Sequence, residues 1–190
     1  MKMSALEAIP TLTFTVNQAA EALGLNEASA KVGLSRYAKS GFILRLKRGE
    51  YIMKSRWQGL DEIETFQIAN RLQVPSYISL LTALAYHGYT TQVPRDIVES
   101  MASMRSCRIQ VKDKIFRYVK IPERFYRNFT KQDEIFIATP EKALLDALHL
   151  MSLGRYRLDL SAIDIDRFDR KRLMRAAKIY PGLDIGRWVR

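Results

Sequence analysis

Two adjacent cations occupy the centre of the segment RLKRGEYIM, residues 45–53. Lys47 and Arg48 precede Gly49, and apolar residues lie on both sides of this group. A glycine between two short apolar runs indicates a β-hairpin, which places the two cations at its tip. Ammonium and guanidinium groups at an exposed tip can bind the phosphates of a nucleic acid without recognising its bases. The segment therefore predicts a phosphate-binding hairpin.

Helix-start signals precede this hairpin. Thr15 and Gln18 have the spacing of a capping box, and Gly24 can end the helix that follows. Asn26 is a good N-cap for a second helix only two residues later. In that helix, steps of three and four residues place four apolar side chains on one face, where we expect a core: Ala30, Leu34, Tyr37 and Ala38. Gly41 is expected to end the second helix, and Phe42 to begin the hairpin.

Polar and basic side chains occupy the other faces of the second helix. Two helices joined by a short turn and followed by a β-hairpin are typical of a winged helix-turn-helix, whose second helix enters the major groove of DNA. Arg36 is our candidate for pairing with guanine, because its fork can donate to O6 and N7 together. The predicted DNA-binding residues come from the second helix and the hairpin: Asn26, Ser29, Lys31, Ser35, Arg36, Lys39, Arg45, Lys47 and Arg48.

The charge of the chain is concentrated on this segment. Residues 16–56 contain eight Lys and Arg against three Asp and Glu, whereas the rest of the first 75 residues is net acidic. The whole chain has 31 basic and 20 acidic residues, and a net charge of +11 favours a polyanionic partner. Cations on a helix are often only solvated, and winged helices also dock proteins. The alternative function is therefore a protein-interaction adaptor without sequence-specific DNA binding.

The length of 190 residues suits two small domains. We predict an α+β fold, with a winged helix-turn-helix domain over residues 1–75 and an α+β C-terminal domain with a smaller sheet over residues 76–190. Asp61 and Glu64 are expected to begin the linking helix of the first domain, and Pro75 follows its end.

The second domain is predicted to begin with a helix from about Ile78 to Gly88. A strand at residues 97–101, a hairpin formed by CRIQV and IFRYVKI, and a strand at EIFIA follow. Thr139 is the expected N-cap of the next helix, with Pro140 in its first position. The predicted domain thus has a small sheet between helices.

A basic helix is predicted over residues 166–180, with Asp166 as its N-cap. Residues 76–190 contain 21 basic and 13 acidic residues, so this domain has its own net charge of +8. A solvated face, a second DNA contact and a docking face for an acidic partner are all compatible with this composition. The sequence leaves these three interpretations open.

Two stretches of the second domain, together with the pattern ahead of them, resemble a known family. YISLLTALAYHGYTTQVP and ATPEKALLDAL are similar to the AbiEi family of bacterial antitoxins, and the resemblance covers nearly the whole chain. It implies a transcriptional autoregulator whose winged helix binds inverted repeats in its own promoter. It also implies an antitoxin role for the C-terminal domain, in an abortive-infection or type IV toxin–antitoxin system with an AbiEii-type nucleotidyltransferase toxin.

The sequence contains no arrangement typical of an enzyme. His87 and His149 are the only histidines, and each lies among apolar neighbours on a predicted helix, which favours a packed or capping side chain. We find no Ser/His/Asp or Cys/His order with a supporting motif and no glycine-rich phosphate loop. The acidic residues Asp164, Asp166 and Asp169 could suggest a metal site. Capping by Asp166 and solvated positions for the other two explain them better. We therefore predict a protein without catalytic activity, cofactor or metal.

The expected location is the cytoplasm, without membrane attachment. The N-terminal residues lack the apolar region of a signal peptide, and no stretch approaches the roughly 18 apolar residues of a membrane span. Cys107 is the only cysteine, so it cannot form an internal disulfide, and we expect a reduced, buried thiol.

Overall fold

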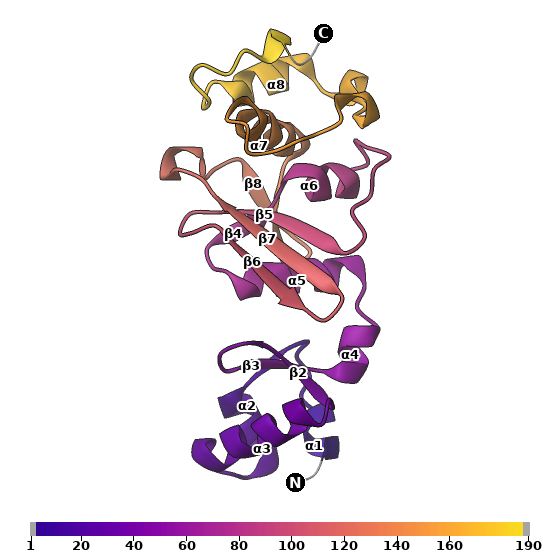
Figure 1. The fold of residues 1–190 in the computed structure, drawn as a ribbon, viewed down its shortest axis with the longest axis vertical. Helices are drawn as coiled ribbons and strands as arrows, with labels where there is room; N and C mark the ends of the chain where they lie inside the picture. The colour runs from indigo at the N-terminus through magenta and orange to yellow at the C-terminus, as the bar shows by residue number, and fades with distance from the viewer. Residues whose placement is uncertain (1–2, 188–190) are drawn as a thin grey trace. The chain divides into compact units, whose positions relative to one another are not determined.

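The computed structural model describes residues 3–187, which form a mixed α+β fold with eight α-helices and two sheets (Figure 1). The chain divides into two compact units, one up to Ile68 and one from Ala69 onward. The division falls within helix α5 (Glu62–Leu72), whereas the predicted boundary followed that helix. None of the described helices has the length and apolar content needed to cross a membrane.

The first unit combines short helices with a three-stranded antiparallel sheet of order β1-β3-β2. Its sheet strands come from distant parts of the segment, because β1 precedes the helices that separate it from the hairpin. The elements are α1 (Met3–Glu7), β1 (Phe14–Thr15), α2 (Val16–Leu23), α3 (Glu27–Lys39), β2 (Ile43–Lys47), β3 (Glu50–Met53), α4 (Lys54–Gln58) and the first turns of α5.

The predicted caps of α2 and α3 are confirmed. The Thr15 hydroxyl accepts the Gln18 backbone N–H at 3.3 Å, and the Gln18 side chain accepts the Thr15 N–H at 2.9 Å. Gly24 ends α2 with a φ of 65°, in the left-handed region that glycine tolerates. The Asn26 side chain then accepts the Ser29 N–H at 2.8 Å and begins α3. These contacts fix the sharp turn between the two helices.

The core of the first unit contains the apolar face predicted for α3. Ala30 and Leu34 are fully buried, and Tyr37 packs against the same cluster. Phe42 differs from the prediction, because it is 54% exposed and β2 begins at Ile43, which is fully buried. The first residue of the hairpin that packs in the core is therefore Ile43, one position later than predicted.

The second unit is built around a six-stranded sheet, so the prediction of a smaller sheet was wrong. The strand order is β6-β7-β5-β4-β9-β8, with parallel pairing between β5 and β7 and between β4 and β9. Helices α6 and α7 pack on each other, and α8 packs on α7. The elements are β4 (Ser76–Ile78), α6 (Leu80–Tyr86), β5 (Ile97–Ala102), β6 (Cys107–Val111), β7 (Lys114–Lys120), β8 (Phe129–Gln132), β9 (Ile135–Ala138), α7 (Pro140–Ser152) and α8 (Arg170–Ala177).

Three elements of this unit depart from the sequence prediction. Residues 76–78 form the inner strand β4, although Ile78 was assigned to a helix. Strand β8 was not predicted. The basic helix is shorter than the predicted range of 166–180, because Asp169 caps α8 by accepting the N–H groups of Lys171 and Arg172. Asp166 lies earlier, in a short 3-10 turn, and is not the cap.

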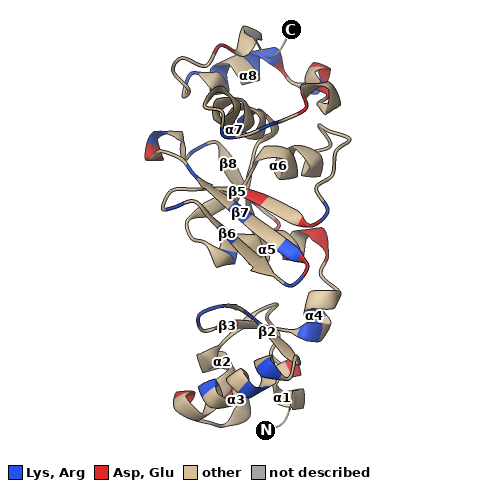
Figure 2. Ribbon diagram, in the orientation of Figure 1, with Lys and Arg blue, Asp and Glu red and all other residues tan. Residues whose placement is uncertain are grey.

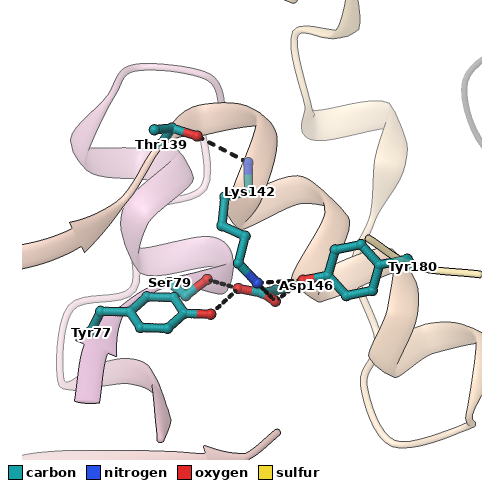
Figure 3. A network of polar contacts seen from close by, with 6 residues as sticks. All are labelled: Tyr77, Ser79, Thr139, Lys142, Asp146 and Tyr180. Carbon is teal, nitrogen blue, oxygen red and sulfur yellow. Dashed lines mark hydrogen bonds and ion pairs between the residues drawn. The ribbon is translucent and has the colours of Figure 1, made fainter. Parts of the chain in front are cut away.

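A fully buried ion pair lies inside the second unit (Figure 3). Lys142 and Asp146 are one turn apart on α7, with 2.5 Å between the lysine Nζ and the carboxylate Oδ1. The hydroxyls of Tyr77 and Ser79 donate to Oδ2 of Asp146 at 3.0 and 2.8 Å. The Tyr180 hydroxyl also contacts both members of the pair. One carboxylate thus connects β4, α7 and the chain beyond α8.

The environment of this pair determines its protonation. Burial lowers the pKa of Lys142, and the adjacent Asp146 carboxylate opposes that shift. Burial, together with the charge of Asp146, raises the pKa values of Tyr77 and Tyr180, so both phenols keep their protons and act as donors. The network is therefore a set of mutually satisfied groups, in which the loss of one leaves another buried without a partner.

We expect Lys142→Met to lower the free energy of unfolding by about 3–5 kcal/mol, because it leaves the Asp146 carboxylate buried without its cation. Lys142→Met combined with Asp146→Asn should cost less than Lys142→Met alone, since the pair is then uncharged and the amide oxygen still accepts hydrogen bonds. Urea denaturation of the wild type, Lys142→Met, Asp146→Asn and the double variant gives the coupling free energy between the two residues. A loss of less than about 1 kcal/mol in the free energy of unfolding for Lys142→Met would show that the ion pair contributes little to stability.

Candidate nucleic-acid interface

The orientation of α3 is fixed by its buried side. Ala30 and Leu34 have no exposed surface, so residues about half a turn away along the helix point into solvent. Asn26 is occupied at the helix start, where its side-chain oxygen caps the first turn. The exposed residues of α3 include every one predicted to contact DNA: Ser29, Lys31, Ser35, Arg36 and Lys39.

The cations of α3 differ in their intramolecular partners. Lys31 forms an ion pair with Glu27 at 3.5 Å, and both side chains are more than half exposed. Within residues 3–187, the side chains of Arg36 and Lys39 have neither a hydrogen bond nor an ion pair. Arg36 is thus not held by Glu27, the carboxylate nearest to it along α3. Its five N–H donors remain available to an external acceptor.

The tip of the β2–β3 hairpin is formed by Arg48 and Gly49. Gly49 has a φ of 79°, a left-handed conformation that glycine adopts without strain. Arg48 is exposed at this turn. Arg45 lies on the exposed side of β2, where its Nε donates to the carbonyl of Lys47 at 3.4 Å. Figure 2 shows basic residues along α3 and at this turn.

Lys47 is more constrained than its neighbour at the tip. Its Nζ lies 3.2 Å from Oε2 of Glu50, which is buried in β3. The other carboxylate oxygen of Glu50 accepts the Thr13 hydroxyl at 2.8 Å. A carboxylate fixed on both sides holds the lysine close to the base of the turn. Lys47 therefore has both a structural contact and the exposed position that the sequence predicted.

One cation of this segment has a structural role that the sequence did not indicate. The guanidinium of Arg56, on α4, donates to the backbone carbonyls of Glu7 and Ile9 at 2.9 and 2.6 Å, and also to that of Thr11. These bonds attach α4 to the chain between α1 and β1. The eight cations counted over residues 16–56 thus include one whose N–H donors are bound within the chain.

An apolar residue lies among the polar ones on the exposed face of α3. Val32 is 54% exposed. Together with Ser29, Gly33, Arg36 and Tyr37 it lines an open concavity of about 500 Å³. Residues 29, 32, 33 and 36 have the spacing of one helix face, a signal that was present in the sequence. The predicted contact residues omitted Val32 and Gly33 because only polar side chains were considered.

The histidines of the second unit are packed among other groups. The Nε2 atom of His87 is 2.8 Å from the carbonyl of Ala138. His149 packs against the rings of Phe125 and Tyr180, and burial lowers its pKa. Both positions agree with the predicted packing.

The other groups considered for chemistry are dispersed. Among residues 3–187, no three His, Cys, Asp or Glu side chains are grouped as metal ligands would be. Asp169 is the helix cap of α8, whereas Asp164 and Asp166 belong to the 3-10 turn at Ile165–Arg167. Cys107 is only partly buried, rather than buried as predicted, and its thiol donates to Gln73 at 3.0 Å.

Comparison with known proteins gives one informative similarity. No family model matches the chain, and no curated protein matches it. The fold is similar to the crystal structure of the RV2827C protein from Mycobacterium tuberculosis, with a TM-score of 0.59 and 11% sequence identity. The match covers 92% of this chain and 69% of that chain. At this identity, the similarity concerns the fold alone.

In DNA titrations, we expect Lys47→Ala and Arg48→Ala each to weaken binding by similar factors on a preferred and on a random duplex. Phosphate contacts position a protein but contain no base information. Each lost contact should lower the slope of log affinity against log salt by about one unit. Arg95→Ala, an exposed arginine of the second unit, is the matched control. A large loss of discrimination between the duplexes would mean that the hairpin recognises bases.

Proposed function

We propose that the chain is a DNA-binding transcriptional autorepressor whose first unit acts as a winged helix-turn-helix. In this proposal α3 enters the major groove and the β2–β3 hairpin lies along the phosphates. The observation that carries it is the exposed face of α3, on which Arg36 and Lys39 have no partner among residues 3–187. Unpaired cations opposite a buried stripe are suited to a polyanion from outside the chain.

The proposed contacts divide into two kinds. Hydroxyl and guanidinium groups in the outward part of α3 are candidates for base edges, and the remaining cations for phosphates. Asn26 has its side-chain oxygen in the cap, which leaves its NH₂ group for a phosphate. The base-edge candidates are Ser29, Ser35 and Arg36. The phosphate candidates are Asn26, Lys31, Lys39, Arg45, Lys47 and Arg48.

We further propose that the protein is the antitoxin of a type IV toxin–antitoxin or abortive-infection system in the cytoplasm. The support is the resemblance of YISLLTALAYHGYTTQVP and ATPEKALLDAL to AbiEi antitoxins. Its functional partner would be an AbiEii-type nucleotidyltransferase toxin, and its target the inverted repeats of its own promoter. A nucleotidyltransferase gene beside the gene for this chain would support this part of the proposal, and a neighbourhood without one would count against it.

A gel-shift titration with the region upstream of its own gene tests the proposed function. We expect the folded protein to shift this duplex at moderate salt and at a lower concentration than a scrambled duplex of the same composition. The net charge of +11 produces some binding to any DNA, so the ratio of the two affinities is the relevant result. Equal affinities for both duplexes would contradict the proposal and favour an adaptor that binds other proteins.

We expect Arg36→Ala to cost about 1–3 kcal/mol of binding free energy on the preferred duplex and less on the scrambled one, because a bidentate arginine distinguishes guanine from other bases. Arg36→Lys is the matched control, since it keeps the charge and loses the fork. Arg36→Lys should retain most of the affinity for scrambled DNA and lose the preference for the upstream duplex over the scrambled one. Equal losses on both duplexes for Arg36→Ala would assign this residue to the phosphates instead.

A further inference from the structure

Val32 occupies the most outward position of α3. It is two residues from both Ala30 and Leu34, and two residues correspond to about 200° around an α-helix. Since Ala30 and Leu34 are fully buried, Val32 points away from the core, and its side chain is 54% exposed. The centre of the exposed face is therefore apolar, although the residues around it are polar or charged.

The residues beside Val32 form a site of mixed chemistry. The open concavity of about 500 Å³ is lined by apolar and polar residues together: Ser29, Val32, Gly33, Arg36 and Tyr37. Valine and glycine both favour a helix interior less than alanine does. Val32 gains little from burial within the chain, so helix stability does not account for this pair. Residues of low helix propensity inside a helix, without a role in packing, are expected at functional positions.

The chemistry of the site suits one group of the DNA major groove. Thymine presents a methyl group there beside a hydrogen-bond acceptor, and none of the other three bases has an apolar group on that edge. A branched aliphatic side chain can pack on this methyl while the neighbouring hydroxyl and guanidinium bind polar base atoms. Gly33 has no side chain, which lets the helix backbone approach the groove closely.

We infer that Val32 is a specificity-determining residue that recognises the 5-methyl group of a thymine, with Gly33 providing room for the approach. This inference rests on the proposed function, because it requires α3 to lie in the major groove. A second copy of this chain fits the surface less well, because a contact between two α3 helices would bring together three cations and only one carboxylate from each. A DNA groove instead offers opposite charge around an apolar group.

Replacement of thymine by deoxyuridine tests this inference, because it removes only the methyl group. The probe is the shortest duplex from the upstream region that the protein prefers over scrambled DNA, with each thymine replaced in turn. Burial of one methyl-sized group corresponds to a loss of about three- to fivefold in affinity. We expect wild-type protein to show this loss at a small number of thymines, and Val32→Ala to show a clearly smaller loss at the same positions, because its single methyl group retains only part of the contact.

Val93→Ala is the matched control, since Val93 is 62% exposed and belongs to the second unit. It should keep the wild-type sensitivity to deoxyuridine. Alanine is a good helix former, so Val32→Ala should retain the circular dichroism of the folded protein. Wild-type protein that binds all deoxyuridine duplexes like the parent, or Val32→Ala with unchanged sensitivity, would overturn the inference and leave the proposed function intact. Wild-type protein without any preferred duplex would overturn both.

Discussion

The burial of Ala30 and Leu34 is the constraint on which the rest of the candidate interface depends. Both side chains have no exposed surface, and they fix the rotation of α3 about its own axis. Once that rotation is fixed, Arg36 and Val32 can only point outward. The cap at Asn26 fixes where the helix begins, and therefore where these residues lie along it. The core of the first unit thus determines which side chains are offered to a ligand.

A second constraint acts in the other unit, where one carboxylate organises three parts of the chain. Asp146 accepts hydroxyl donors from Tyr77 and Ser79 and forms an ion pair with Lys142. Tyr77 and Ser79 belong to the first of the two stretches that resemble AbiEi antitoxins, and Lys142 and Asp146 belong to the second. The resemblance therefore includes residues that build the interior. It does not identify a binding surface.

Local chemistry accounts for what the sequence could predict. The N-caps of α2, α3 and α7, the left-handed Gly24 and the β2–β3 hairpin follow from interactions within a few residues, and each was predicted. The cap of α8 was assigned to Asp166, whereas Asp169 occupies that position. Strand β4 was not predicted, because Ile78 has the spacing of the helical apolar face formed with Leu81 and Leu84, and only the pairing with β5 and β9 makes this segment a strand. The partners of Arg56 also depend on the tertiary fold, because they lie more than 40 residues earlier in the chain. Val32 was omitted because an apolar side chain on a helix is usually expected in a core.

Backbone amide chemical shifts, mapped on binding of the upstream duplex, show directly whether α3 is the DNA-recognition helix. The full chain of 190 residues is small enough for resolved spectra, and each amide reports on its own surroundings. We expect the largest shifts in residues 29–39 of α3 and residues 45–49 of the hairpin, and smaller shifts with a scrambled duplex. Shifts confined to the second unit, or equal shifts with both duplexes, would contradict the assignment of α3 as the DNA-recognition helix.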